Sequence, residues 1–256
     1  MSANYQSPVT NHQYGGHHPQ RPGPVSALAE ILAHPAIWRG NRPVAVSSPS
    51  LPTGFPALDA ELPGGGWPTA ALIEILPQHE GIGELRILGH ALSRLTAQGL
   101  FLVWIAPPYL PYAPALRNAG IDLARLILVR TRSPQETLWA SEQALRSNAC
   151  GAVLAWPQTA NYAELRRLQI AAEGSTVLAV LFRPPRVARE VTPAPLRLSL
   201  ATAHGELAVR VLKRRGSPLV NPIILRSPLP SNHHAVDRAR LPSPAARIVS
   251  AGVSAV

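Results

Sequence analysis

A short glycine loop after an apolar run is the part of this chain best placed for chemistry. The run spans residues 71–76, and Gly81-Ile82-Gly83-Glu84-Leu85 follow shortly after it. A strand, a glycine loop and a helix in this order can cradle phosphates when the loop reads G-x-x-x-x-G-K-[ST]. Here Glu84 and Leu85 stand near the positions of the required Lys and hydroxyl, and the single lysine of the chain is Lys213. The loop therefore reads as a degenerate nucleotide loop.

Two other functions are conceivable for this loop. Its glycines could place an anion at the N-terminus of the following helix, but Glu84 would repel a phosphate there. A dinucleotide fingerprint fails, because Arg86 stands at its third glycine position. We interpret the loop as a strand-to-helix turn. No G-x-S-x-G motif and no zinc-ligand spacing occurs in the sequence, so we expect no catalytic residue, metal or cofactor. Cys150 is expected in the core.

Composition points to one α/β domain with tails. The chain has 256 residues, 46% of them hydrophobic, and a net charge of +10. No apolar run reaches the ~18–20 residues that cross a bilayer, and the N-terminus lacks a signal pattern. Since one cysteine fits a reducing compartment, we expect a cytoplasmic protein without membrane contact. Residues 213–256 hold seven basic side chains and one acid, a net of +6. Such a segment suits nucleic acid or an acidic protein surface, or is simply solvated.

The apolar pattern alternates between strands and helices. Continuous apolar runs predict buried parallel strands, and periodic stretches predict the helices between them. The expected strands are 71–76, 100–106, 126–130, 152–156 and 176–182, and the expected helices are 83–98, 112–119, 134–147 and 161–173. Segments 196–200 and 206–212 alternate around a turn and predict an antiparallel hairpin at one sheet edge. The fold class is therefore α/β with a mostly parallel sheet.

Three regions follow from this pattern. Residues 1–24 are rich in Pro, Gly and His and are expected to be a disordered N-terminal extension. Residues 25–215 contain the apolar periodicity and form the expected core domain. Proline recurs from residue 216 to 256, and we expect a Pro/Arg-rich flexible tail in which only 219–225 could still pack.

The segment TGFPALDAELPGGGWP at 53–68, the GIGELR after the first strand, and the closing hairpin with VLKRRG resemble the ImuA group. These are proteins associated with translesion synthesis and related to RecA and to the SulA division inhibitor. The resemblance covers about residues 27–215. It implies a RecA-like core of the P-loop NTPase type with a degenerate nucleotide site.

Comparison with the RecA type implies that the chemistry is lost at three places. The phosphate loop lacks its Lys and hydroxyl. The catalytic carboxylate expected after strand 100–106 is replaced by Pro107 and Pro108, which cannot take a proton. The Mg²⁺-linked Asp expected at the end of strand 152–156 is replaced by Ala155 and Trp156. We therefore expect no ATP hydrolysis.

The same resemblance places candidate contacts. RecA-type proteins bind a DNA strand through loops after the later core strands, and the loop here carries Arg183, Arg186 and Arg189. Weak DNA binding through these arginines is expected to depend on salt, although an exposed solvated loop is the plainer interpretation. The C-terminal tail offers apolar anchors and charges for docking onto a partner, namely Ile223, Ile224, Leu225, Arg238, Arg240 and Arg247.

Two functions remain in competition. The resemblance implies a non-catalytic accessory protein of SOS-induced, error-prone translesion synthesis. Its implied partners are a Y-family-polymerase-like protein of the ImuB type, an error-prone C-family DNA polymerase and, as a further candidate, RecA. The alternative is a SulA-like inhibitor that binds the tubulin-like cell-division protein. That role needs only the core, so the long basic tail favours the accessory protein.

Overall fold

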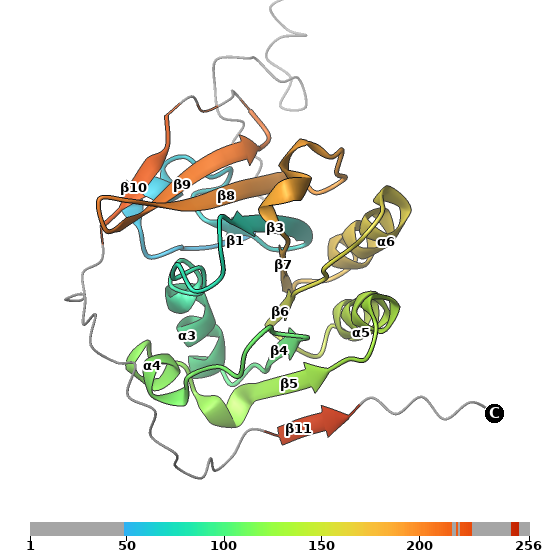
Figure 1. The fold of residues 1–256 in the computed structure, drawn as a ribbon. Coiled ribbons are helices and arrows are strands. Elements are labelled where there is room, and N and C mark those ends of the chain that lie inside the picture. The colour runs from blue at the N-terminus through green and yellow to red at the C-terminus, as the bar shows by residue number, and fades with distance from the viewer. Residues whose placement is uncertain (1–48, 217–218, 220, 227–246, 251–256) are drawn as a thin grey trace, which may run out of the picture. The chain divides into compact units, whose positions relative to one another are not determined.

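The computed structural model describes residues 49–216, 219 and 221–226, and the backbone of 247–250. All of them lie in the compact unit Gly40–Val256. The main sheet has nine strands in the order β10-β9-β8-β3-β7-β6-β4-β5-β11 (Figure 1). All strands of this sheet run in the same direction except β9, which is antiparallel to both β8 and β10. The strands are β3 (Ala71–Pro77), β4 (Leu102–Ile105), β5 (Leu126–Arg130), β6 (Ala152–Ala155), β7 (Leu178–Phe182), β8 (Leu196–Ala203), β9 (Glu206–Lys213), β10 (Ile223–Leu225) and β11 (Arg247–Ser250). The predicted mostly parallel sheet with an antiparallel hairpin is confirmed.

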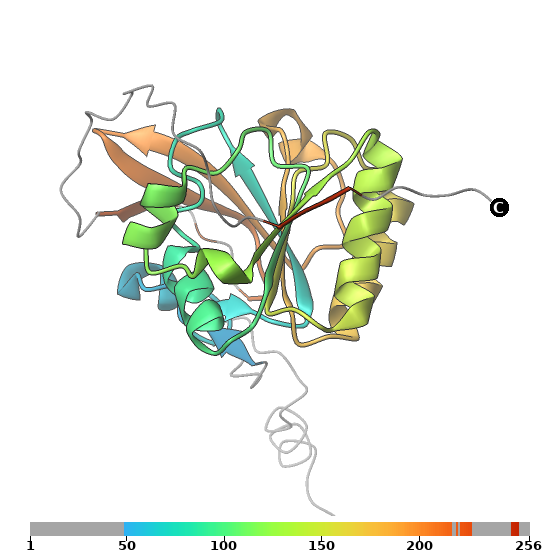
Figure 2. The ribbon, with the colours of Figure 1, turned by 90° about the horizontal axis from the view of Figure 1, so that it is seen from below.

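Helices cover both faces of the sheet, as Figure 2 shows with the sheet edge-on. Helices α2 (Pro56–Asp59), α3 (Gly89–Ala97) and α4 (Ala113–Asn118) pack on one face, around Leu58, Leu92 and Leu116. Helices α5 (Pro134–Ser147) and α6 (Tyr162–Glu173) pack on the other, around Leu138 and Leu168. Because the central strands are buried on both sides, their sequences are continuously apolar rather than alternating.

Polar caps fix where α5 and α6 begin. The Ser133 side chain accepts a hydrogen bond from the Glu136 N–H. Asn161 and Glu164 form a reciprocal capping box at the start of α6. These caps orient the first turns of both helices at the end of the sheet where the parallel strands finish.

The glycine-rich entrance segment folds against the core. Strands β1 (Ser50–Leu51) and β2 (Trp67–Pro68) pair antiparallel and flank α2. A Cβ on Gly66 would stand 2.3 Å from the Leu51 carbonyl oxygen, so only glycine permits this pairing. Trp67 is fully buried, and Thr53 is held by Asp59. The segment at 53–68, one of those that carry the family resemblance, therefore packs against the core and has a structural role.

Two short strands lie within the predicted flexible tail, 216–256, and the first of them falls in the part, 219–225, that was expected to be able to pack. Strand β10 pairs with β9, and Leu225 is 3% exposed within the core. Strand β11 pairs in parallel with β5 at the opposite edge. The sequence signal was weak because each strand is three or four residues long and lies among prolines. The predicted N-terminal extension, 1–24, lies outside the described residues.

Candidate functional site

The carboxyl ends of the parallel strands are where α/β proteins place their sites, and the loop that the sequence predicts to be a degenerate nucleotide loop lies there. The loop occupies residues 78–88, between β3 and α3. Gly81 and Gly83 have φ of 81° and 93°, in the left-handed region that glycine tolerates. The predicted helix 83–98 is therefore wrong at its start, since α3 begins only at Gly89, and no side chain caps it. The loop does not lead its glycines directly into a helix N-terminus as a phosphate cradle does.

Two side chains of this loop, Glu84 and Leu85, turn inward. Glu84 lies half-buried, with Oε1 3.5 Å from the Gly81 amide nitrogen. Its Oε2 is buried and has no hydrogen-bond partner within the protein. Leu85 packs against the core on the α3 face. These contacts make the loop a packed turn, and its buried carboxylate would oppose a phosphate.

Aromatic side chains fill the core where the next strands end. The rings of Trp104 and Trp156 lie 5.8 Å apart, and those of Trp156 and Phe182 stack at 4.8 Å. The Trp104 indole N–H is buried without a hydrogen-bond partner in the protein. A cluster of this kind excludes water and contributes through packing. It leaves no oxygen ligand at the end of β6, where a Mg²⁺-linked carboxylate would stand.

Neither a metal site nor a reactive thiol is found among the described residues. They contain no group of three or more His, Cys, Asp or Glu that could hold a metal ion. Cys150 is buried, and burial raises the pKa of its thiol to about 11. A thiol with so high a pKa stays protonated and is a poor nucleophile near neutral pH.

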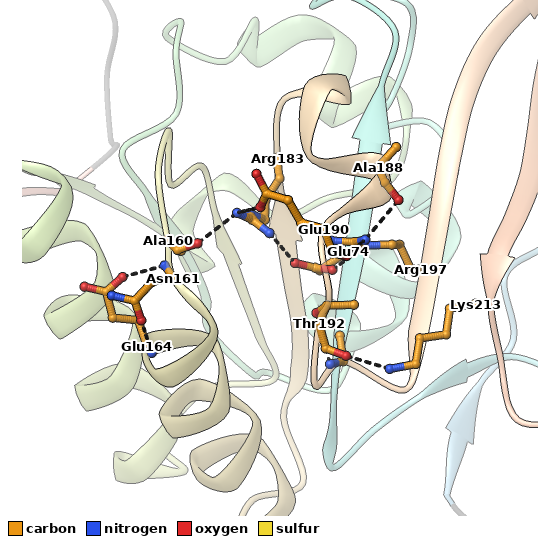
Figure 3. A network of polar contacts seen from close by, with 11 residues as sticks. Glu74, Ala160, Asn161, Glu164, Arg183, Ala188, Glu190, Thr192, Arg197 and Lys213 are labelled. Atoms are coloured by element: carbon orange, nitrogen blue, oxygen red, sulfur yellow. Dashed lines mark hydrogen bonds and ion pairs between the residues drawn. The ribbon is translucent and has the colours of Figure 1, made fainter.

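A buried ion network joins β3, β7 and β8 (Figure 3). Glu74 on β3 is fully buried and pairs with two arginines. Arg183 Nη1 lies 2.9 Å from Glu74 Oε1, and Arg197 Nε lies 2.7 Å from Oε2. Glu74 alternates with Ile73 and Ile75, which pack on the α3 side, so its side chain lies on the sheet face that carries α5 and α6.

The network ties down the loop between β7 and β8. Arg183 also donates to the Ala160 carbonyl and pairs with Glu190 at 3.3 Å. Arg197 donates to the carbonyls of Ala188 and Glu190. Lys213 donates to the Thr192 carbonyl, and its pKa is lowered by burial and by Arg197. The loop, which contains the short helix η2 (Pro185–Arg189), is thereby fixed over the sheet.

The structure corrects the DNA-contact prediction for one of its three arginines. Arg183 is 2% exposed and committed to Glu74, so its guanidinium is not available to a nucleic acid. Arg186 and Arg189 on η2 are exposed, and Arg186 donates to the Gln158 carbonyl. The signal that could have revealed the network is the acid within an apolar strand, since a buried Glu74 requires a cationic partner.

The predicted docking residues divide between the sheet and residues outside it. Ile223 packs against the core and Leu225 is buried, so neither is a free anchor. Ile224 is 41% exposed on β10. Arg238 and Arg240 lie outside the described residues, and Arg247 is described only as backbone in β11.

The fold is that of an α/β protein in which aromatic and ion-paired side chains pack at the carboxyl ends of the parallel strands. A family model described as cell division inhibitor SulA matches residues 75–178. Protein ImuA of Caulobacter vibrioides is 34% identical over 131 residues, which are 49% of this chain and 54% of that protein. Cell division inhibitor SulA of Photorhabdus laumondii is 31% identical over 119 residues, 46% of this chain and 67% of that protein. The chain belongs to the family of ImuA- and SulA-like proteins, and it spans about half the length of the ImuA relatives it matches.

The matches fall on the sheet and its helices. The SulA family model begins within β3 and ends at the first residue of β7. It therefore covers the α3, α4, α5 and α6 crossovers but neither the hairpin β8–β9 nor the C-terminal strands. None of the helices in the described ranges is long and apolar enough to cross a membrane.

Proposed function

We propose that this protein is a non-catalytic accessory factor of SOS-induced, error-prone translesion DNA synthesis. It would act by contacts with a Y-family-polymerase-like protein, an error-prone C-family polymerase and RecA. The similarity to ImuA supports this proposal most directly. The protein would present a RecA-like core whose nucleotide site has become a packed structural region.

The geometry supports a role without phosphoryl transfer. Catalysis of that reaction needs a lysine or arginine clamp, a metal and a group that orients the nucleophile. Within the described residues, the loop after β3 offers the inward-facing Glu84, and the ends of β4 and β6 carry Pro107 and Trp156. Burial of Trp104, Trp156 and Phe182 suits a rigid scaffold rather than a site that must open to nucleotide.

The alternative function is a SulA-like inhibitor that binds the tubulin-like division protein. The SulA family model and the SulA relative support it, and the family model matches core residues 75–178 and nothing C-terminal to the start of β7. The two functions differ in the partner that should bind the same core.

Co-purification separates the two proposals. The full chain, carrying an affinity tag, would be co-expressed with the polymerase-like protein of its own genome and, separately, with the tubulin-like division protein. Retention of the polymerase-like protein alone supports the accessory role. Retention of the division protein together with inhibition of its GTP-dependent assembly supports the alternative and overturns the first proposal.

A further inference from the structure

Five neighbouring parallel strands, β3, β7, β6, β4 and β5, end at one edge of the sheet. With strands about 4.8 Å apart, their ends span about 19 Å. Figure 2 shows the loops after β3 and β7 on the same side of the sheet. Backbone contacts hold neighbouring ends together, because Ala106 donates to the Val129 carbonyl and Trp156 to that of Ile105. We call this the carboxyl edge.

Every tyrosine in the described part of the chain lies at the carboxyl edge and is exposed. Tyr109 in the loop after β4 is 70% exposed, Tyr112 before α4 is 63% exposed, and Tyr162 at the start of α6 is 53% exposed. Pro107, Pro108 and Pro111 restrict the backbone around the first two. A partner that stacks on these rings therefore orders little additional backbone.

Exposed arginines lie at the same edge as these tyrosines. Arg130 ends β5, next to the start of the loop that holds Tyr109, and Arg132 follows it. The others come from the loops after β3 and β7. The exposed arginines of the carboxyl edge are Arg86, Arg130, Arg132, Arg186 and Arg189.

The acids of this edge mostly face their own backbone or a buried partner. Glu136 accepts from the Arg132 N–H at 2.6 Å, and Glu164 from the Asn161 N–H at 2.7 Å. Glu190 pairs with Arg183. The exception is the exposed Glu80, which lies beside Tyr109 and, by hydrogen bonding to it, raises the pKa of that phenol. Among the charged side chains of this edge that are not held in this way, arginines outnumber Glu80.

Exposed aromatic rings among arginines form a recognisable binding chemistry. Bases of a single strand stack on aromatic side chains, and arginines contact the phosphates between them. We propose that the carboxyl edge binds single-stranded DNA, with Tyr109, Tyr112 and Tyr162 as stacking groups. This inference goes beyond the proposed accessory role, because it requires no protein partner. It also replaces the buried Arg183 of the sequence-based prediction by groups that reach solvent.

Fluorescence anisotropy of the purified full chain with a labelled oligothymidine of about 20 nucleotides tests the proposal. Tyr109→Ala should weaken binding about tenfold, since stacking on one aromatic ring has roughly that effect, whereas Tyr109→Phe should retain the parent affinity. Glu80→Gln should tighten binding by removing a repulsive charge. A duplex of the same length should bind more weakly, because its bases are already stacked.

A matched charge control comes from the amino ends of the parallel strands, opposite the carboxyl edge. Arg125 lies in the short helix η1 (Leu123–Arg125) before β5 and stacks on Phe101 at 5.0 Å. Arg132→Gln should weaken oligothymidine binding. It should also make the plot of log affinity against log salt concentration shallower by about 0.7, as expected when one phosphate of a single strand is no longer neutralised. Arg125→Gln removes the same charge and should leave the affinity nearly unchanged. Thermal melts of these surface variants should match that of the parent.

Three results would overturn the proposal. One is parent-like oligothymidine binding by Tyr109→Ala. Another is an equal decrease in affinity for Arg125→Gln and Arg132→Gln, which would assign binding to the overall charge. A third is a Tyr109→Ala variant that keeps the oligothymidine but no longer co-purifies with the polymerase-like protein, which would make the carboxyl edge a protein-docking surface. Because the binding assay contains only this protein and DNA, its failure leaves the accessory role untouched.

Discussion

Glu74 shows how one residue can determine a local structure. An acid inside an apolar strand must be compensated, and here two arginines from later strands provide the compensation. The loop between β7 and β8 is held over the sheet by the remaining donors of those arginines.

Removal of the Glu74 carboxylate should therefore be costly. Glu74→Ala leaves two buried guanidinium groups without their counter-charge, and we expect a loss of about 3–5 kcal/mol in the free energy of unfolding. Glu142 is the matched control. It also lies between two arginines, Arg146 and Arg167, but these are 59% and 60% exposed. Glu142→Ala should cost at most about 1 kcal/mol. Urea titration measures both, and equal losses would contradict the role given to Glu74.

The buried thiol of Cys150 predicts a dependence of stability on pH. Its folded-state pKa of about 11 lies above the ordinary value of 9.0, so the unfolded chain loses this proton first as pH rises. The free energy of unfolding should then fall between about pH 9 and 11, by at most about 3 kcal/mol from this group. Unfolding curves for Cys150→Ala should show a smaller fall over the same range. An identical fall in parent and variant would show that other groups cause it.

At the scale of elements, strand β10 shows that the packed core includes residues C-terminal to the hairpin β8–β9. Leu225 is buried while its neighbour Ile224 is exposed, as expected for alternate faces of an edge strand. Leu225→Asp should lower the free energy of unfolding by about 3 kcal/mol or more, because a carboxylate would enter the apolar core. Ile224→Asp should cost less than about 1 kcal/mol. Thermal melts distinguish the two. If both variants melt like the parent, the C-terminal segment is not part of the stable fold.

The same element explains what sequence reasoning could and could not predict. The strands from Ala71–Pro77 to Glu206–Lys213 were predictable because long apolar runs bounded by caps and glycines carry a strong local signal. The start of α3 was predicted too early. Gly81 and Gly83 adopt left-handed backbone conformations, and turns closed by hydrogen bonds between residues three apart follow them, so the helix begins only at Gly89. Segment 219–225 was expected to be able to pack, but strand β10 within it was not predicted, because its stability comes from pairing with β9, an interaction that its own three residues do not encode. Tyr162 lies 50 residues after Tyr112 in the sequence, and only the order of the strands places it at the same edge as Tyr109 and Tyr112.

At the scale of the whole molecule, the packed strand ends predict an inert response to nucleotide. The purified chain with ATP and Mg²⁺ should release no phosphate above a buffer blank, with or without single-stranded DNA. The physical reason is the absence, among the described residues, of a carboxylate at the ends of β4 and β6. A colorimetric phosphate assay measures this directly. Phosphate release stimulated by DNA would refute it and would also argue against the accessory role proposed above.

The positions of β10 and β11 have a consequence for biogenesis. The two strands lie C-terminal to all the other strands of the main sheet, yet they occupy its two opposite edges. We therefore expect that, while the chain is being synthesised, β9 and β5 each have one side with unpaired backbone N–H and C=O groups until β10 and β11 have left the ribosome. Open strand edges of this kind are templates for pairing with another chain. A chain that stops before residue 223 should consequently form concentration-dependent aggregates that bind an amyloid dye, because nothing remains to seal the sheet at either side.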